Sequence, residues 1–211
     1  MAKNKYYAVK NGKEIGIFDN WADCSKQVHG FPGAIYKGFP TLAEAEKYFN
    51  GQESKESKYY ETEDELMKDI KDGEMIAYVD GSNLGDGSAF SWGIVTFSKA
   101  LGKKCINGMS TNEEQTKYRN IAGELFASVH ATNFAIDNNM TKIIIYHDYS
   151  GIRHWALGEW KCRNKLSKDY KAFFEKAKGL IEFEFVKVKG HTGDKFNEEA
   201  DVLAKKALGI K

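Results

Sequence analysis

The sequence has few cysteines and no long apolar run. Three cysteines, Cys24, Cys105 and Cys162, occur in 211 residues. Their odd number and wide spacing argue against a disulfide framework or a zinc knuckle, so we expect a reducing, cytoplasmic environment. No stretch approaches the roughly 20 apolar residues of a membrane helix. The chain also begins without the apolar segment of a signal peptide, and we expect no membrane partner.

An excess of charge of one sign is missing too. The chain has 31 Lys and Arg against 30 Asp and Glu, a net charge of +1. No overall field therefore attracts a polyanion, and any nucleic-acid surface must be local. The apolar content of 42% is ordinary for a soluble globular protein. The length fits one domain or two small ones.

Residues 1–50 form a first small unit. Three stretches are rich in β-forming residues: 6–9, 15–18 and 34–39. Asn11-Gly12 between the first two is a strong signal for a tight type I′ hairpin. Asn20 can cap a helix that Gly30 ends, and Thr41 with Glu44 is a capping-box pattern that opens a second helix. The expected order is ββαβα.

Residues 51–73 differ in composition. They contain eight Asp and Glu against four Lys, and residues 51–58 include no apolar side chain. Such a segment cannot bury enough surface to fold alone, so we expect an acidic, flexible linker. Leu66, Met67 and Ile70 indicate a short helix just before the second domain.

From residue 74 to 211 the pattern is α/β. The expected strands are 75–80, 89–98, 103–110, 142–148 and 181–188. The expected helices are 112–138, 152–160, 167–178 and 197–208. This order predicts three antiparallel strands followed by parallel strands joined through helical crossovers. In the longest helix Ile121, Leu125 and Val129 repeat at four and predict a buried stripe.

Four carboxylates occupy distinctive places in this second domain. Asp80 ends the first strand, before a glycine turn, and Asp148 ends the fourth. Glu124 lies one residue off the apolar stripe of the long helix, and Asp201 lies in the last helix. Taken singly, each of these acids is most simply explained as a turn residue, a helix cap or a solvated charge on a helix. Gathered together they would repel strongly unless metal ions neutralised them.

These residues together resemble type 1 ribonuclease H. The resemblance covers residues 74–211 and depends on these segments: Asp80-Gly81-Ser82, Glu124-Leu125, Asp148, Gly190-His191-Thr192-Gly193, Asn197-Glu198 and Asp201. It implies a five-stranded mixed sheet flanked by helices. The first fifty residues resemble the hybrid-binding, caulimovirus viroplasmin-like domain that precedes many such catalytic domains. That likeness depends on these segments: Tyr6-Tyr7-Ala8-Val9, Gly16-Ile17-Phe18, Trp21, Cys24, Gln27-Val28, Phe31 and Tyr36-Lys37-Gly38-Phe39.

The resemblance implies an endonuclease that hydrolyses the RNA strand of RNA–DNA hybrids and leaves 5′-phosphate and 3′-hydroxyl ends. Two Mg²⁺ ions, or Mn²⁺, would serve, since hard oxygen ligands suit them better than zinc. Asp80 would bridge both ions. Asp201 would complete the site of the ion that activates the nucleophile, and Glu124 and Asp148 the other. His191 would carry protons or assist product release.

Substrate contacts are implied in both domains. Near the acids the candidates are Gly81, Ser82, Asn120 and Asn197. In the first unit they are Tyr7, Trp21, Tyr36, Lys37 and Phe39, which would stack on sugars of the DNA strand or meet its phosphates. Trp21 and Phe39 could equally be core. Gly38, Ile121 and Ser150 stand where the family often has Lys, Asn and Gln.

Three other functions stay open. One is a two-metal nuclease with broader, double-stranded RNA specificity, and another is a retroelement-type nuclease domain. The absence of a polymerase region argues against the latter. The third is a non-catalytic hybrid-binding protein, against which the presence of all four acids argues. We expect a monomer without an obligatory protein partner.

Overall fold

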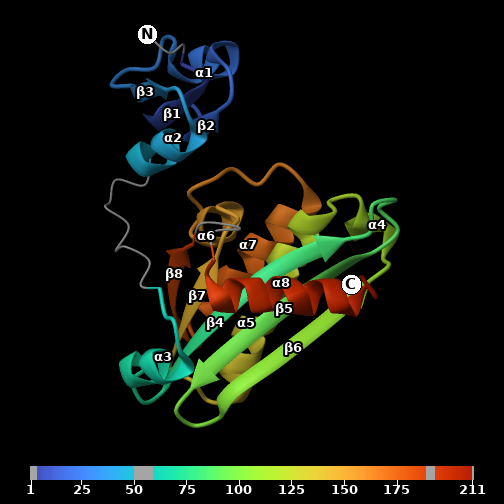
Figure 1. The fold of residues 1–211 in the computed structure, drawn as a ribbon. Helices are drawn as coiled ribbons and strands as arrows, with labels where there is room; N and C mark the ends of the chain where they lie inside the picture. Colours follow the sequence, from blue (N-terminus) through green and yellow to red (C-terminus); the bar gives the residue numbers. More distant parts are fainter. Residues whose placement is uncertain (1–3, 50–58, 189–192, 211) are drawn as a thin grey trace.

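The computed structural model describes residues 4–49, 59–188 and 193–210. The first unit holds a three-stranded antiparallel sheet of order β2-β1-β3 (Figure 1). Its elements are β1 (Tyr6–Asn11), β2 (Gly16–Phe18), α1 (Trp21–Val28), β3 (Ile35–Phe39) and α2 (Leu42–Phe49). A small core of Val9, Cys24 and Val28 joins α1 to the sheet. The predicted ββαβα order is therefore confirmed.

Both predicted helix caps form in this unit. The Asn20 side chain accepts a hydrogen bond from the backbone N–H of Asp23 at 2.9 Å. The Thr41 hydroxyl accepts from the N–H of Glu44, whose carboxylate accepts from the N–H of Thr41. The tight hairpin at Asn11-Gly12 was a wrong prediction. Val9 pairs with Gly16, which leaves a longer connection, because Asn11 instead pairs with β3.

The second unit holds a five-stranded sheet of order β6-β5-β4-β7-β8. The strands are β4 (Glu74–Asn83), β5 (Phe90–Ser98), β6 (Gly102–Ser110), β7 (Lys142–His147) and β8 (Glu182–Lys187). β4, β5 and β6 pair antiparallel, and β4, β7 and β8 pair parallel. This is the mixed sheet that the sequence predicted.

Helices cover both faces of this sheet. They are α3 (Glu63–Asp69), α4 (Glu113–Thr116), α5 (Asn120–Asp137), α6 (Gly151–Ala156), α7 (Lys165–Ala177) and α8 (Lys195–Ala207). Alternate residues of β4 point to opposite faces. Met75 and Ala77 pack in the core formed with α5, whereas Ile76 and Tyr78 pack in the core under α8 (Figure 1). The strand that carries Asp80 therefore has α5 on one face and α8 on the other.

Three elements differ from the prediction. The helix expected over 112–138 is two helices, because the backbone at Arg119 takes a φ of 53° and breaks it. β4 does not end at Asp80 but continues to Asn83, since β5 pairs with it throughout. The helix expected over 152–160 ends at Ala156. The short helix predicted from Leu66, Met67 and Ile70 is confirmed as α3, because Leu66 and Ile70 are buried against the sheet.

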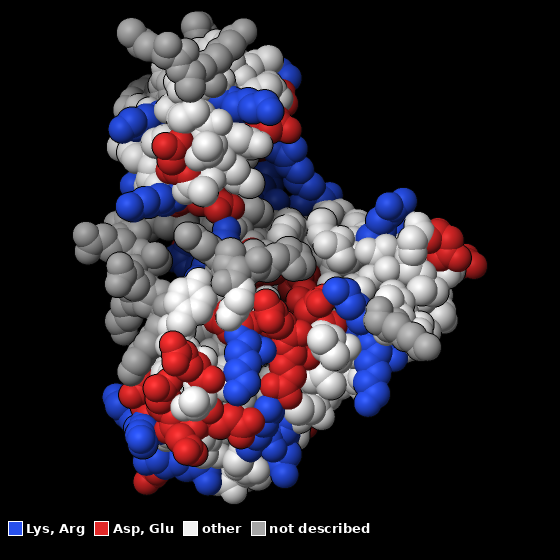
Figure 2. All heavy atoms as spheres, viewed as in Figure 1, with Lys and Arg blue, Asp and Glu red and all other residues white. Residues whose placement is uncertain are grey.

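No helix in the described part of the chain is long and apolar enough to cross a membrane. Figure 2 shows basic and acidic side chains on the same face of the molecule, with acidic side chains gathered over the region of α3.

Candidate active site

Three of the four predicted acids meet at one end of the sheet. Asp80, Glu124 and Asp148 each offer a carboxylate oxygen, and these oxygens all lie within 4.8 Å of one another. Tyr78 of β4 pairs with Tyr146 of parallel β7. Asp80 and Asp148 each follow that pair by two residues, so the parallel register places them side by side. Glu124 reaches them from α5.

Glycines bring the helices close enough to deliver these acids. A Cβ on Gly123 of α5 would lie only 2.8 Å from the Cα of Gly81, and one on Gly81 would lie 2.6 Å from the carbonyl oxygen of Asn120. On the opposite face, a Cβ on Gly93 of β5 would lie 2.6 Å from the amide nitrogen of Ala204 in α8. Real side chains do not allow such contacts, so backbone packs on backbone.

Burial and crowding change how these acids ionise. Asp80 is 7% exposed and Glu124 is 4% exposed. Burial, and after it the charge of Asp148, raises the pKa of Asp80 to about 6. Burial and the charge of Asp80 raise the pKa of Glu124 well above its usual value. A proton held by Glu124 and donated to Asp80 is the simplest arrangement of this pair.

The donor set fits a hard divalent cation. The Oε2 atom of Glu124 is buried and has no hydrogen-bond partner among the described residues. A buried carboxyl oxygen left unpaired beside two further acids is costly, and a bound cation would remove this cost by replacing the proton of Glu124. Oxygen-only ligands are those that Mg²⁺ or Mn²⁺ prefer, and no histidine or cysteine of the described residues joins the cluster.

Asp201 lies next to this cluster rather than inside it. Its charge contributes to the raised pKa of Asp80. Its Oδ2 atom accepts a hydrogen bond from the ammonium of Lys205, one turn along α8, at 2.6 Å. The sequence therefore predicted the three converging acids, and the structure adds Lys205 as the partner of the fourth.

Comparison with known families agrees with this geometry. Residues 72–209 match the RNase H family, and residues 5–49 match the family described as the ribonuclease H1 N-terminal domain. The first match alone spans more than half of the chain. The chain belongs to the ribonuclease H family.

Relatives of this ribonuclease H are distant. Ribonuclease H1 of Homo sapiens is 25% identical over 254 residues, which cover 95% of this chain and 88% of that protein. Ribonuclease H of Crithidia fasciculata is 50% identical over 46 residues, 22% of this chain and 9% of that protein. RNase H1 from the archaeon Halobacterium salinarum NRC-1 shares the fold, with a TM-score of 0.54 at 22% identity over 64% of this chain and 98% of that one. LC11-RNase H1, solved with an RNA/DNA hybrid, has a TM-score of 0.51 at 16% identity over 64% of this chain and 99% of that one.

The remaining candidates near the acids occupy different positions. Asn120 is the exposed first residue of α5, and Gly81 and Ser82 are half-buried in β4. Asn197 lies in the first turn of α8, 5% exposed, and its Oδ1 has no hydrogen-bond partner within the described ranges. His191 lies outside the described residues.

The candidates in the first unit of this ribonuclease H divide between the two faces of its sheet. Tyr7, Trp21 and Tyr36 form one aromatic cluster, with ring centroids 5.3 Å and 5.7 Å apart in succession. Trp21 is 47% exposed, so it is not a core residue. Lys37 and Phe39 alternate to the other face, where the Lys37 ammonium lies 5.5 Å from the centre of the Phe39 ring.

One residue next to the acids was missed by the sequence analysis. His147 is buried, and its Nδ1 lies 2.9 Å from the carbonyl oxygen of Tyr149, across the turn that carries Asp148. Burial lowers its pKa to about 3, so the ring is neutral and donates this hydrogen bond. His147 therefore fixes the Asp148 turn. In the sequence, the one sign of this role was the position of His147 at the end of a strand, directly before the candidate acid Asp148.

Proposed function

We propose that this ribonuclease H is a divalent-metal-dependent endonuclease that cuts the RNA strand of RNA–DNA hybrids and leaves 5′-phosphate and 3′-hydroxyl ends. The observation that carries the proposal is the convergence of Asp80, Glu124 and Asp148, with a buried Glu124 oxygen left unpaired. Such a site is arranged for a cation and not for a neutral ligand.

Asp80, Glu124, Asp148 and Asp201 are the residues that would hold two Mg²⁺ ions. Bound there, the ions would lower the pKa of an attacking water and neutralise charge on the leaving oxygen. The residues themselves supply the frame. Gly81 and Gly123 hold β4 and α5 in backbone contact, so the spacing between Asp80 and Glu124 is fixed before any ligand binds.

The first unit supports capture of the substrate. In its aromatic cluster Trp21 and Tyr36 are exposed and Tyr7 is half-buried beneath them, which offers flat apolar surfaces that suit stacking on sugars or bases. A binding unit tethered to a nuclease raises the local concentration of substrate at the acids. We therefore assign recruitment to the first unit and hydrolysis to the second.

The test compares cutting of an end-labelled RNA–DNA hybrid with cutting of RNA–RNA duplex and single-stranded RNA, in Mg²⁺ and in Mn²⁺. Asp80→Asn provides the metal-site variant. Cutting confined to the RNA of the hybrid, and lost in Asp80→Asn with binding retained, is the expected result. Equal cutting of RNA–RNA would favour the broader nuclease, and binding without cutting in either metal would leave a hybrid-binding protein.

A further inference from the structure

The two units face each other across a groove of about 990 Å³. Its wall on the second unit includes Asp148 and carries three cations, Lys161, Arg163 and Lys187. All charged residues of its wall on the first unit are acidic: Glu14, Asp19, Asp23 and Glu46. The walls are therefore opposite in charge, and the positive one adjoins the acid cluster.

Glu46 of α2 makes the most enclosed contact across this groove. Its Oε1 atom accepts from the Ser150 hydroxyl at 2.8 Å, and its Oε2 atom accepts from the Lys187 ammonium at 2.6 Å. The ammonium also contacts the Ser150 hydroxyl. The Glu46 side chain is only 12% exposed. Ser150 follows Asp148 by two residues, so this contact lies at the edge of the active site.

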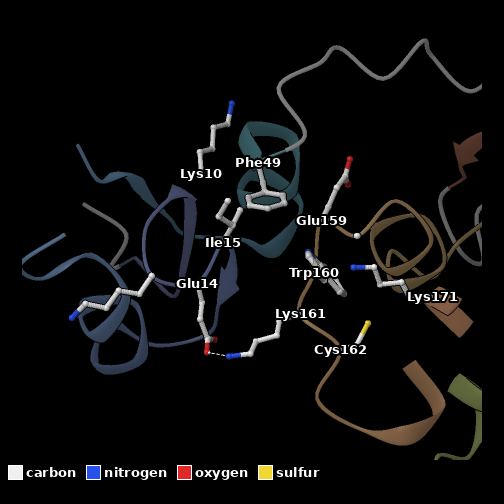
Figure 3. Close-up of a pocket in the computed structure, with 11 residues that line it drawn as sticks. Lys10, Glu14, Ile15, Phe49, Glu159, Trp160, Lys161, Cys162 and Lys171 are labelled. Carbon is white, nitrogen blue, oxygen red and sulfur yellow. Dashed lines mark hydrogen bonds and ion pairs between the residues drawn. The ribbon is translucent and has the colours of Figure 1, made fainter. Parts of the chain in front are cut away.

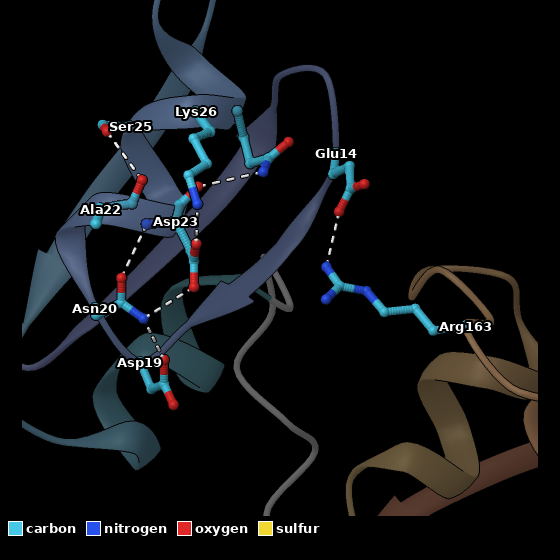
Figure 4. A network of polar contacts seen from close by, with 9 residues as sticks. Glu14, Asp19, Asn20, Ala22, Asp23, Ser25, Lys26 and Arg163 are labelled. Atoms are coloured by element: carbon cyan, nitrogen blue, oxygen red, sulfur yellow. Dashed lines mark hydrogen bonds and ion pairs between the residues drawn. The ribbon is translucent and has the colours of Figure 1, made fainter.

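Glu14 makes the second contact. One of its carboxylate oxygens accepts from the Lys161 ammonium at 2.7 Å (Figure 3). The other accepts from Nη2 of Arg163 at 2.9 Å (Figure 4). Both cations are well exposed, so water and competing anions can reach them. In the adjacent pocket Phe49 and Trp160 approach from opposite units (Figure 3). Phe49 also packs edge-on against His154 of the second unit, with ring centroids 5.7 Å apart. The contact between the units thus combines ion pairs with one aromatic contact.

Ammonium, guanidinium and hydroxyl groups are the donors that proteins use for phosphodiester oxygens. We propose that four residues beside Asp148 bind the phosphodiester backbone of the hybrid: Ser150, Lys161, Arg163 and Lys187. In this structure the carboxylates of Glu14 and Glu46 occupy that site in place of phosphate groups. The hybrid must displace these carboxylates to reach the acids. This inference rests on the proposed function, because it takes the hybrid as substrate.

The acidic groove wall of the first unit explains why displacement is needed. This wall would repel a phosphate backbone lying in the groove. The aromatic cluster of Tyr7, Trp21 and Tyr36 does not line the groove. The cluster therefore stays available to a hybrid while the cationic wall is covered, and capture can precede displacement.

Hybrid binding to the full chain, measured by anisotropy of a labelled RNA–DNA hybrid in EDTA, tests this. The double variant Glu14→Gln/Glu46→Gln keeps side-chain shape but removes the competing charges, and we expect about three- to tenfold tighter binding. Lys187→Met should weaken binding about three- to tenfold and reduce the salt dependence by about one ion. Lys187→Arg should restore it, which separates a lost contact from a damaged fold. Glu175→Gln and Lys176→Met on α7 are the matched controls.

Unchanged affinity in the Glu14→Gln/Glu46→Gln variant would overturn the proposal. So would a Lys187→Met variant with wild-type affinity. Cutting of the hybrid by wild-type protein, assayed alongside in Mg²⁺, keeps this failure distinct from failure of the proposed function. If wild-type protein cuts no hybrid, the nuclease assignment itself is wrong.

Discussion

Replacing Asp80 by asparagine is expected to stabilise the metal-free protein while it abolishes hydrolysis. In the folded chain the pKa of Asp80 is raised from 3.8 to about 6, by burial and by the charge of Asp148. An acid with a raised pKa gives up its proton more readily in the unfolded chain. Its ionisation therefore opposes folding, and asparagine removes that opposition.

The size and pH range follow from this shift. A shift of about two pKa units corresponds to about 3 kcal/mol, an upper limit because Asp80 and Glu124 share a proton. Below about pH 4 Asp80 is protonated in the folded and in the unfolded chain, so removing its charge does not change the free energy of unfolding. The gain grows as the pH rises from about 4 to about 6 and is then constant at about 1–3 kcal/mol.

Urea unfolding in EDTA between pH 4 and pH 8 measures this gain. Asp86→Asn is the control of opposite sign, because hydrogen bonds from Ser88 lower the pKa of that exposed carboxyl. Saturating Mg²⁺ should stabilise wild-type protein more than Asp80→Asn and so reduce the difference. A stability difference between Asp80→Asn and wild type that does not change with pH would refute the reasoning.

Three further substitutions test the frame, the fourth acid and the aromatic cluster. Gly123→Ala should push α5 away from β4, which would cost about 1–3 kcal/mol of stability in urea unfolding and lower kcat about 100-fold. Gly85→Ala, where a Cβ meets open space, should change neither quantity. Normal activity of Gly123→Ala would contradict the close-packing argument. Lys205→Met should cost less than about 1 kcal/mol of stability, because the ion pair with Asp201 is partly exposed. It should also lower the Mg²⁺ concentration for half-maximal cutting, because the ammonium no longer competes for Asp201. A higher Mg²⁺ concentration for half-maximal cutting would show that Lys205 supports the site instead. Trp21→Ala should weaken hybrid binding by about 1–3 kcal/mol in anisotropy titrations with kcat unchanged, and unaltered affinity would remove the aromatic cluster from recognition.

Local signals predicted the fold well. Asn20 and the Thr41–Glu44 pair cap helices through bonds that span three residues, so the sequence around them was sufficient. The failures involve partners distant in sequence. The Asn11 side chain donates to the carbonyl oxygen of Gly33, 22 residues away, and the hairpin turn it was expected to form is absent. β4 continues past Asp80 because β5 pairs with it, which the β4 sequence alone could not indicate.

The candidate site was also predicted only where local sequence signals were sufficient. Asp80 and Asp148 follow recognisable strands, and parallel pairing brings them together. Glu124 was expected at the border of the core, and it is buried because Gly123 lets α5 approach β4. The contact of Glu46 with Lys187 joins residues 141 positions apart, without any local pattern to predict it.

The distribution of the free thiols has a practical consequence. Cys24 is fully buried, Cys105 is exposed, and Cys162 is half-buried in the pocket between the two units (Figure 3). With Cys105 replaced by serine, Cys162 becomes the accessible attachment point for an environment-sensitive dye. If the hybrid displaces Glu14 and Glu46 as we propose, the emission of that dye would change when the units separate. The chain thus supplies a single-site optical reporter of the proposed displacement, without an engineered cysteine.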